Sequence, residues 1–237
     1  MIRRFGAALL GFSAVGSFAL AGGSGPAGVW PEFTPNAACE PAIQSGSLRL
    51  GTQPDAAASA QMQTIFAADQ VDRQGDIDWE AVGTRDLERE KQVLKLLENG
   101  RLFTGKDLLA AAYVFHHGSC PNHYLLAHTL AKQAIVVRGA RPKWMYASTL
   151  DRWLLSTGQP QKYGTQPAVI NTVFDFYTGR AQACERTEAP IDPAVTDAER
   201  ARYDVQPLTE LQALYAQSDE ADLRNCQQLV EQGQTDK

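Results

Sequence analysis

Apolar residues recur at helical spacing through the middle of the chain, from Ala56 to Thr157. Few prolines interrupt this interior, and short links that contain glycine or proline separate its periodic segments. The pattern predicts helices over roughly 56–72, 78–99, 104–117, 121–138 and 142–157. Because links of a few residues make neighbouring helices antiparallel, we expect an all-α fold, either a bundle or an irregular array of antiparallel helical hairpins.

Residues with known end preferences mark where these helices begin and stop. Asp55 is placed to cap the first helix and Asp78 to open the second. Pro142 falls in the first turn of the fifth helix, where its missing N–H costs little, and Gly158 follows the last turn. The third helix, KDLLAAAYVFHH, is apolar on nearly all sides, which predicts that it is the central helix of the core.

Composition changes at both ends of this helical interior. The segment before it is rich in Gly, Pro and Ser and predicts an irregular arm, with Val29-Trp30 and Leu48 to Leu50 as apolar anchoring points and room for a short edge strand. Prolines break the segment after Gln166 into a short piece around Val173 to Tyr177 and a last helix or two. We divide the mature chain into an arm (22–55), a helical core domain (56–166) and a partly helical C-terminal extension (167–237).

The first residues have the features of an export signal. Arg3 and Arg4 precede an apolar run from Phe5 to Leu20, and Ala19-Leu20-Ala21 has the small-x-small form of a cleavage site. We predict a signal peptide over residues 1–21 and a periplasmic or secreted mature chain. A bilayer span needs about 20 apolar residues, and this run, interrupted by Gly and Ser, is short for that. No stable membrane span is therefore expected in the mature chain, with an uncleaved anchor as the alternative.

The charge balance argues against a nucleic-acid partner. The chain has 22 basic and 27 acidic residues and a formal net charge of −5. Removing residues 1–21 takes away two arginines and no acidic residue, which leaves 20 basic against 27 acidic residues, or −7. Proteins that bind nucleic acids carry clustered positive charge that neutralises phosphates, and nothing in this balance suggests it.

Four cysteines form an even set in a chain predicted to reach an oxidising compartment. Four cysteines allow three pairings of two disulfides. We favour Cys184 with Cys226, which would tie the C-terminal extension together, and Cys39 with Cys120, which would tie the arm to the core. Because there is no C-x-x-C, a zinc ribbon or a thioredoxin-type site is disfavoured.

Charged residues interrupt the apolar stripes of two predicted helices. Asp151 falls inside the apolar arc of the fifth helix, and Asp86 and Arg89 fall inside the core stripe of the second. A lone buried charge is costly enough that it must be paired, hydrogen-bonded or neutralised. These positions therefore demand partners. Arg152, one step round from Asp151, is expected on the polar, less deeply buried side.

The histidines do not have the spacing of a metal site. His123 and His128 are five residues apart, about 140° round a helix axis, and no H-E-x-x-H occurs, so we predict no metal and no cofactor. His116 and His117 end the third helix. Each is compatible with a hydrogen-bonded core imidazole, and we favour His117 as a functional residue because it is closer to the helix end.

The segment DRWLLSTGQPQKYGTQ carries a recognisable pattern, together with the upstream segments AADQVDRQG, TRDLEREKQVLKLLENG and AAYVFHHG. It resembles an uncharacterised bacterial domain family marked by D-R followed by G-x-x-Q-x-Y-G-T-Q. The resemblance covers about Ala56 to Gln166 and implies no established activity. The signature positions here are Asp151, Arg152, Gly158, Gln161, Tyr163, Gly164, Thr165 and Gln166.

The loop that follows the fifth helix can return over the helix end and meet Asp151. Tyr163, Thr165 and Gln166 supply donors for the carboxylate, and Gly164 allows a backbone geometry that other residues resist. In a structural interpretation, Asp151 and Arg152 pin this loop to the helices. In a functional one, the loop from Gln161 to Gln166, His116-His117 and the Asp86-Arg89 pair line one cleft.

Two function classes remain open. One is an exported hydrolase in which a histidine, His117, acts as a general base oriented by a carboxylate, Asp151, while Arg and Gln side chains bind a polar substrate. The other is an exported, noncatalytic helical binding module for an unknown small polar ligand or an envelope protein. There is no G-x-S-x-G elbow, Walker-type loop or G-x-G-x-x-G after a strand, which favours the binding module slightly.

Export gives the first testable prediction. The mature protein should begin near Gly22, because cleavage is predicted after Ala21. N-terminal sequencing of native material from outside the cytoplasm checks this. A native chain that still starts at Met1 would contradict it.

Overall fold

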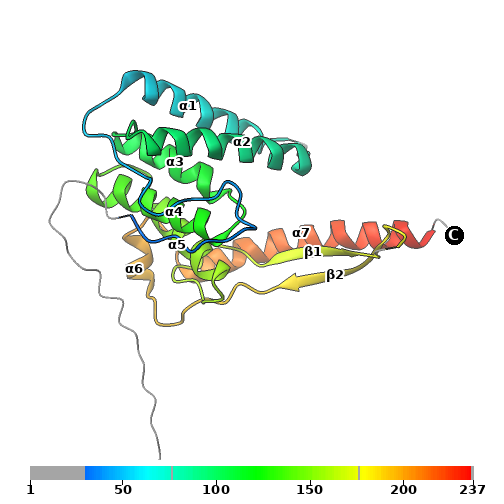
Figure 1. Cartoon of the computed structure of the whole chain (residues 1–237). Helices are drawn as coiled ribbons and strands as arrows, with labels where there is room; N and C mark the ends of the chain where they lie inside the picture. Colours follow the sequence, from blue (N-terminus) through cyan, green and yellow to red (C-terminus); the bar gives the residue numbers. More distant parts are fainter. Residues whose placement is uncertain (1–29, 76, 176, 236–237) are drawn as a thin grey trace, which may run out of the picture.

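The computed structural model describes residues 30–75, 77–175 and 177–235 (Figure 1). The predicted signal peptide and its cleavage site lie outside the described residues. The described elements, in chain order, are α1 (Ala56–Val71), α2 (Trp79–Glu98), α3 (Gly105–His116), α4 (Pro121–Lys132), the π-helix η1 (Gln133–Val137), α5 (Trp144–Ser156), β1 (Val169–Phe174), β2 (Ala181–Thr187), α6 (Asp197–Ala201) and α7 (Leu208–Thr235).

The chain is mainly helical, and all five helices predicted for the interior are present. Their beginnings follow the predicted caps: the Asp55 carboxylate accepts a hydrogen bond from the Ala58 amide at 2.9 Å, and Asp78 caps α2 in the same way. Pro142 lies just before α5 rather than in its first turn. The fourth predicted helix ends in the π-helix η1, for which the sequence carries no signal that we recognised.

The central position predicted for the third helix is confirmed. Nine of its residues are buried, and it packs against α1, α2, α4 and α5. Leu108, Ala111 and Phe115 have no exposed surface. Because α3 offers apolar side chains in every direction, its neighbours bury their apolar faces against it, and one continuous core results.

The arm before α1 is irregular, and its described part, residues 30–55, contains no strand. Phe33, Ile43 and Leu48 are buried in the same core as the helices. The backbone amide of Arg49 donates to the Leu97 carbonyl at 2.9 Å, and a disulfide joins Cys39 to Cys120, as we expected. The arm is thus fixed to the core by apolar burial, backbone hydrogen bonds and a covalent bond.

The all-α prediction is wrong in the C-terminal extension, where β1 and β2 form an antiparallel hairpin. Both strands run alongside α7, away from the five central helices (Figure 1). The β1 sequence, VINTVF, is rich in β-branched residues. Between the strands, the Asp175 carboxylate accepts hydrogen bonds from the backbone amides of Tyr177 and Thr178 and from the Thr178 hydroxyl. These hydrogen bonds stabilise the turn.

The predicted disulfide between Cys184 and Cys226 ties β2 to α7, and Arg186 pairs with Asp219 across the same contact. Among the described helices, including the long α7, none combines the length and apolar character needed to cross a membrane.

A second, smaller core joins the extension to α5. It contains Ala147, Tyr163, Val205 and Leu211. Arg200 is buried there, and its Nε donates to the Tyr163 carbonyl at 2.9 Å. The loop that follows α5 is therefore enclosed, with α5 on one side and the extension on the other.

Candidate functional site

The Asp151 carboxylate is completely buried and receives four hydrogen bonds from the loop after α5. Its Oδ1 accepts from the amides of Lys162 and Tyr163 at 2.7 and 2.9 Å. Its Oδ2 accepts from the Thr165 amide at 2.9 Å and the Thr165 hydroxyl at 2.8 Å. Burial raises the pKa of Asp151, and these hydrogen bonds oppose that rise. The carboxylate holds the loop in place. Because each of its oxygens already accepts two hydrogen bonds, neither oxygen is left for a ligand.

The prediction that loop donors satisfy Asp151 is confirmed, with two corrections. Tyr163 contributes its backbone amide rather than its hydroxyl, because its ring is buried beside Tyr203 in the smaller core. The Gln166 side chain does not contact Asp151 at all. Gly164 has a φ of +81°, and a Cβ there would lie 3.1 Å from Ile191 Cδ1, so the turn requires glycine.

Gln161 and Gln166 bind each other and the surrounding backbone. The Gln161 side chain donates to the carbonyls of Gln166 and Ala189 and accepts from the Gln166 amide, all within 3.0 Å. The Gln166 amide group donates to the Ser148 hydroxyl at 3.0 Å. Its Oε1 accepts from Arg152 Nε at 3.0 Å. Gln161 is thus a loop residue with a structural contact set, whereas Gln166 connects the loop to Arg152.

Arg152 is half-buried, less deeply than Asp151 as expected, but the polar side of α5 is not exposed. The reason is that α4 packs against this part of α5, so that Ser148 and Thr149 are fully buried as well. Arg152 Nη1 donates to the His116 carbonyl at 2.8 Å, and the guanidinium lies 5.7 Å from the centre of the Tyr124 ring. Burial lowers the pKa of Arg152.

Asp86 and Arg89 find their partners in Asp72 and Arg73, directly after α1. Arg89 donates to Asp86 and to Asp72, each at 2.6 Å, and Arg73 donates to Asp86 at 2.7 Å. Arg85 donates to Asp72 at 2.7 Å. Arg89 is buried and Asp86 is half-buried, so the charges that interrupt the α2 stripe are neutralised in one network between α1 and α2.

His117 forms a pair with a carboxylate that the sequence analysis did not select. Its Nδ1 lies 3.0 Å from Asp69 Oδ1, and Asp69 has no exposed surface. Arg73 Nη1 lies 3.0 Å from the same oxygen, and the Gln70 amide donates to the other at 2.8 Å. Asp151, proposed from the sequence as the orienting carboxylate, does not contact His117. The available signal was that Asp69 follows Met62 and Ile65 on the buried face of α1, the same anomaly that marks Asp151.

The tautomer of His117 follows from this pair. A carboxylate oxygen accepts a hydrogen bond from an imidazole N–H, so we assign the proton to Nδ1, which leaves a lone pair on Nε2. The side chain keeps 19% of its surface exposed. Nε2 makes no hydrogen bond to a described residue and is the atom left for a ligand.

His116 joins the two networks. Its carbonyl holds Arg152, and its ring lies 5.7 Å from the ring of His117, centre to centre. His116 Nε2 lies 3.3 Å from the Ser148 hydroxyl, while Nδ1 is buried with no hydrogen-bond partner among the described residues. Burial lowers the pKa of His116 well below its usual value, so the ring is neutral at pH 7.

A cavity of about 240 Å³ lies beside His117. Its lining residues are Glu40, Gly83, Asp86, Leu87, Glu90, His117 and Ser119. Glu90 is buried, and burial together with the nearby charge of Asp86 raises its pKa to about 8. At neutral pH the cavity therefore holds a protonated carboxylic acid and an imidazole that is held by a buried carboxylate.

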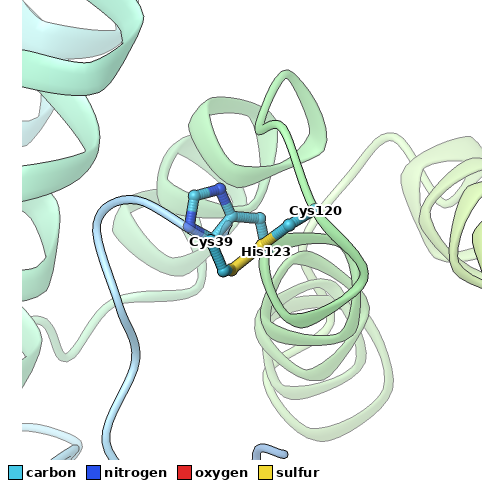
Figure 2. Close-up of side chains that lie close together, drawn as sticks. All are labelled: Cys39, Cys120 and His123. Carbon is cyan, nitrogen blue, oxygen red and sulfur yellow. A yellow bond between two sulfur atoms is a disulfide. The ribbon is translucent and has the colours of Figure 1, made fainter. Parts of the chain in front are cut away.

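Two cysteines and a histidine lie together at the junction of arm and core (Figure 2). Cys39, Cys120 and His123 have ligand atoms within 4.8 Å of one another, close enough to hold a metal ion. The two sulfur atoms are bonded to each other, so neither thiolate is free to ligate while the disulfide persists. His123 is also engaged: Nδ1 accepts from the Ser119 amide at 3.3 Å and Nε2 lies 2.9 Å from the Pro41 carbonyl.

The predicted site residues thus fall into three positions. Asp86 and His117 line the cavity, with Arg89 directly behind Asp86. His116, Arg152 and Gln166 form an adjoining group. The remaining residues do not line the cavity and instead hold the loop after α5 in place: Asp151, Gln161, Tyr163 and Thr165.

Comparison of the chain with family models, curated proteins and solved structures finds no match. Any function must be argued from the geometry of these groups.

The Asp151 network predicts a stability effect. Replacing Asp151 with Asn puts an NH₂ group against at least one N–H or O–H donor, because both carboxylate oxygens accept two hydrogen bonds. We expect Asp151→Asn to lower the free energy of unfolding by about 1 to 3 kcal/mol in denaturant titrations. The matched control is Asp222→Asn, at an exposed position of α7, with an expected change below about 0.5 kcal/mol. Equal stability of the two variants would contradict the network.

Glu90 predicts a pH effect. Its pKa of about 8 in the folded protein exceeds the usual 4.5, so the folded state keeps a proton that the unfolded state loses. The stability it contributes is therefore complete below pH 4.5 and is lost as the pH rises toward 8. In denaturant titrations at pH 5, 6.5 and 8, Glu90→Gln should remove this decline.

The comparison of wild type with Glu90→Gln isolates Glu90, because both proteins keep the other charged and titratable groups that face it. These are Asp69, Arg73, Asp86, Arg89, His123 and Tyr124. Parallel pH profiles of wild type and Glu90→Gln would show that Glu90 is ionised in the folded protein at neutral pH.

Proposed function

We propose that the protein is an exported enzyme of hydrolase type, with its reaction centre in the cavity beside His117. The observation that carries the proposal is the contact between His117 Nδ1 and the buried Asp69 carboxylate at 3.0 Å. A carboxylate at Nδ1 fixes the ring and its tautomer and stabilises the imidazolium that forms when Nε2 takes a proton. A histidine held in this way is suited to act as a general base.

The surroundings of Asp69 support this role. Arg73 and Gln70 both bind the carboxylate, which limits its movement. Arg73 is itself held by Asp86, a residue of the cavity wall. The position of the general base would therefore depend on a series of three contacts, from His117 to Asp69, from Asp69 to Arg73 and from Arg73 to Asp86.

Glu90 is suited to the complementary role of proton donor. It shares the cavity wall with His117, and with a pKa of about 8 it is protonated at neutral pH. A base that accepts a proton from water and an acid that protonates a leaving group are the two groups that hydrolysis requires. In this mechanism His117 Nε2 takes the proton of the attacking water, and the Glu90 carboxyl gives its proton to the leaving group.

Two features support export, which is part of the proposal. The N-terminal residues carry a charged start, an apolar run and a small-x-small cleavage pattern. All four cysteines are paired in disulfides, which form and persist in oxidising compartments. The enzyme would then act in the periplasm or outside the cell.

A second candidate function is a noncatalytic module that binds a small polar ligand. The observation that favours it is that, within the described residues, no serine or threonine hydroxyl hydrogen-bonds His117 and each cysteine is in a disulfide. The small, polar cavity suits a small polar ligand rather than a segment of an envelope protein.

Substitution of His117 separates these candidates. Hydrolysis of p-nitrophenyl acetate and p-nitrophenyl phosphate is measured for the wild type and for His117→Gln. The enzyme proposal expects turnover of at least one ester and a loss of about 100-fold or more in the variant, the usual contribution of a general base. The Tm should change by only a few degrees, because His117 is partly exposed.

The matched control is His128→Gln, at another half-buried histidine, which contacts Thr149 and Tyr146 instead of the cavity. It should keep wild-type turnover. If the wild type hydrolyses neither ester, or if His117→Gln is as active as the wild type, the enzyme proposal is refuted and the binding module takes its place.

A further inference from the structure

Arg152 carries a half-buried positive charge with no acidic partner among the described residues. Its described hydrogen bonds go to two neutral oxygens, the Gln166 side-chain oxygen and the His116 carbonyl. No carboxylate of a described residue lies within 4.0 Å of the guanidinium. Burial of an arginine without a counter-charge is costly, and proteins usually avoid it.

The neighbouring charges do not supply the missing partner. The cluster beside His117 contains the arginines 73, 85, 89 and 152 and the aspartates 69, 72 and 86. Glu90 is protonated at neutral pH and His116 is neutral, while Glu40, at the cavity rim, pairs with Lys91. Three of the four arginines thus pair with the three aspartates, and the arginine of this cluster without a carboxylate partner is Arg152.

The guanidinium group of Arg152 is also held in a fixed orientation, and some of its N–H groups make no hydrogen bond to a described residue. Gln166 accepts from Nε and the His116 carbonyl accepts from Nη1, and these two hydrogen bonds fix the plane of the group. Nη2 makes no hydrogen bond to a described residue and is not buried from solvent. The two hydrogens of Nη2 and one hydrogen of Nη1 therefore remain to bind the oxygens of an oxyanion.

A second side chain close by lacks a partner. His116 Nδ1 is buried without a hydrogen bond, and the residue has only 7% of its surface exposed. Its own carbonyl is the acceptor for Arg152. Two neighbouring residues, one cationic and one polar, thus lack the partners that buried groups of their kind normally have.

From this geometry we propose that Arg152 binds an oxyanion, the carboxylate or phosphate group of the ligand, next to His117. The proposal rests on the proposed function in that it places the charged end of the ligand beside the reaction centre. It also gives the loop after α5 a purpose. Asp151 fixes the loop, the loop fixes Gln166, and Gln166 orients Arg152.

The test titrates the wild type with inorganic phosphate and, separately, with acetate, at constant ionic strength set by NaCl and with Tm as the readout. We expect a saturable rise in Tm with at least one anion, and the arm that responds tells phosphate from carboxylate. Arg152→Gln should weaken this binding at least 10-fold, and Arg152→Lys less, because it keeps the charge but loses the fork. Arg138→Gln is the matched control, since Arg138 lies over the Phe103 ring away from the cluster, and it should bind like the wild type.

A measurement on the wild type alone covers the case that Arg152→Gln does not fold. Phosphate or acetate should protect Arg152 from modification by phenylglyoxal, as mapped by peptide mass. Equal binding by Arg152→Gln and wild type, no saturable response of the wild type, or no protection of Arg152 would each overturn the proposal.

Failure of this inference can be told apart from failure of the proposed function. His117→Gln should bind phosphate or acetate within a few-fold of wild type, because its ring is not part of the fork. Anion binding without any ester hydrolysis would leave the oxyanion site standing and refute the enzyme. Hydrolysis that depends on His117 but not on Arg152, in a protein that binds neither anion, would support the enzyme and refute the oxyanion site.

Discussion

The buried Asp151 carboxylate is the constraint on which the rest of the site depends. A carboxylate with no exposed surface is tolerable only with its hydrogen bonds complete, so α5 and the loop after it must fold together. The loop in turn needs the C-terminal extension: the Gln161 amide donates to the Pro190 carbonyl, and Arg200 donates to the Tyr163 carbonyl. A single side chain on α5 therefore couples the helical core to a hairpin and a helix far along the chain.

The same helix links this support to the groups that can do chemistry. Asp151 faces the loop, while its neighbour Arg152 faces the end of α3 and holds the His116 carbonyl. The next residue of α3, His117, binds Asp69 at the end of α1. Two adjacent residues of α5 thus have different roles: Asp151 holds the loop, and Arg152, which also contacts the loop through Gln166, presents a positive charge. In the structure, the D-R pair of the sequence is therefore one residue that fixes the loop and one that carries a charge to the end of α3.

Local features could be predicted from the sequence, and long-range pairings could not. The ends of α1 and α2 followed from their caps, and the donors for Asp151 followed because the loop lies within 14 residues of it. The pair of Asp69 and His117 spans 48 residues and depends on how α1 packs against α3, which periodicity alone does not specify. The cover over the polar side of α5 was not expected, because a helical projection does not show that α4 packs against that face.

The distribution of charge distinguishes a functional cluster from a structural one. Between α1 and α2 the arginines 73, 85 and 89 pair with the aspartates 72 and 86, although Arg89 Nε is buried without a hydrogen bond to a described residue, and such pairing is what a structural network needs. At the end of α3 the arrangement is different: Arg152 has no counter-charge, His116 has an unpaired nitrogen, and His117 has an oriented ring with its other nitrogen free. Stability alone does not favour such unpaired groups, because apolar residues of similar size would cost less to bury. Their concentration at one helix end, beside a polar cavity, is the reason to place the function there.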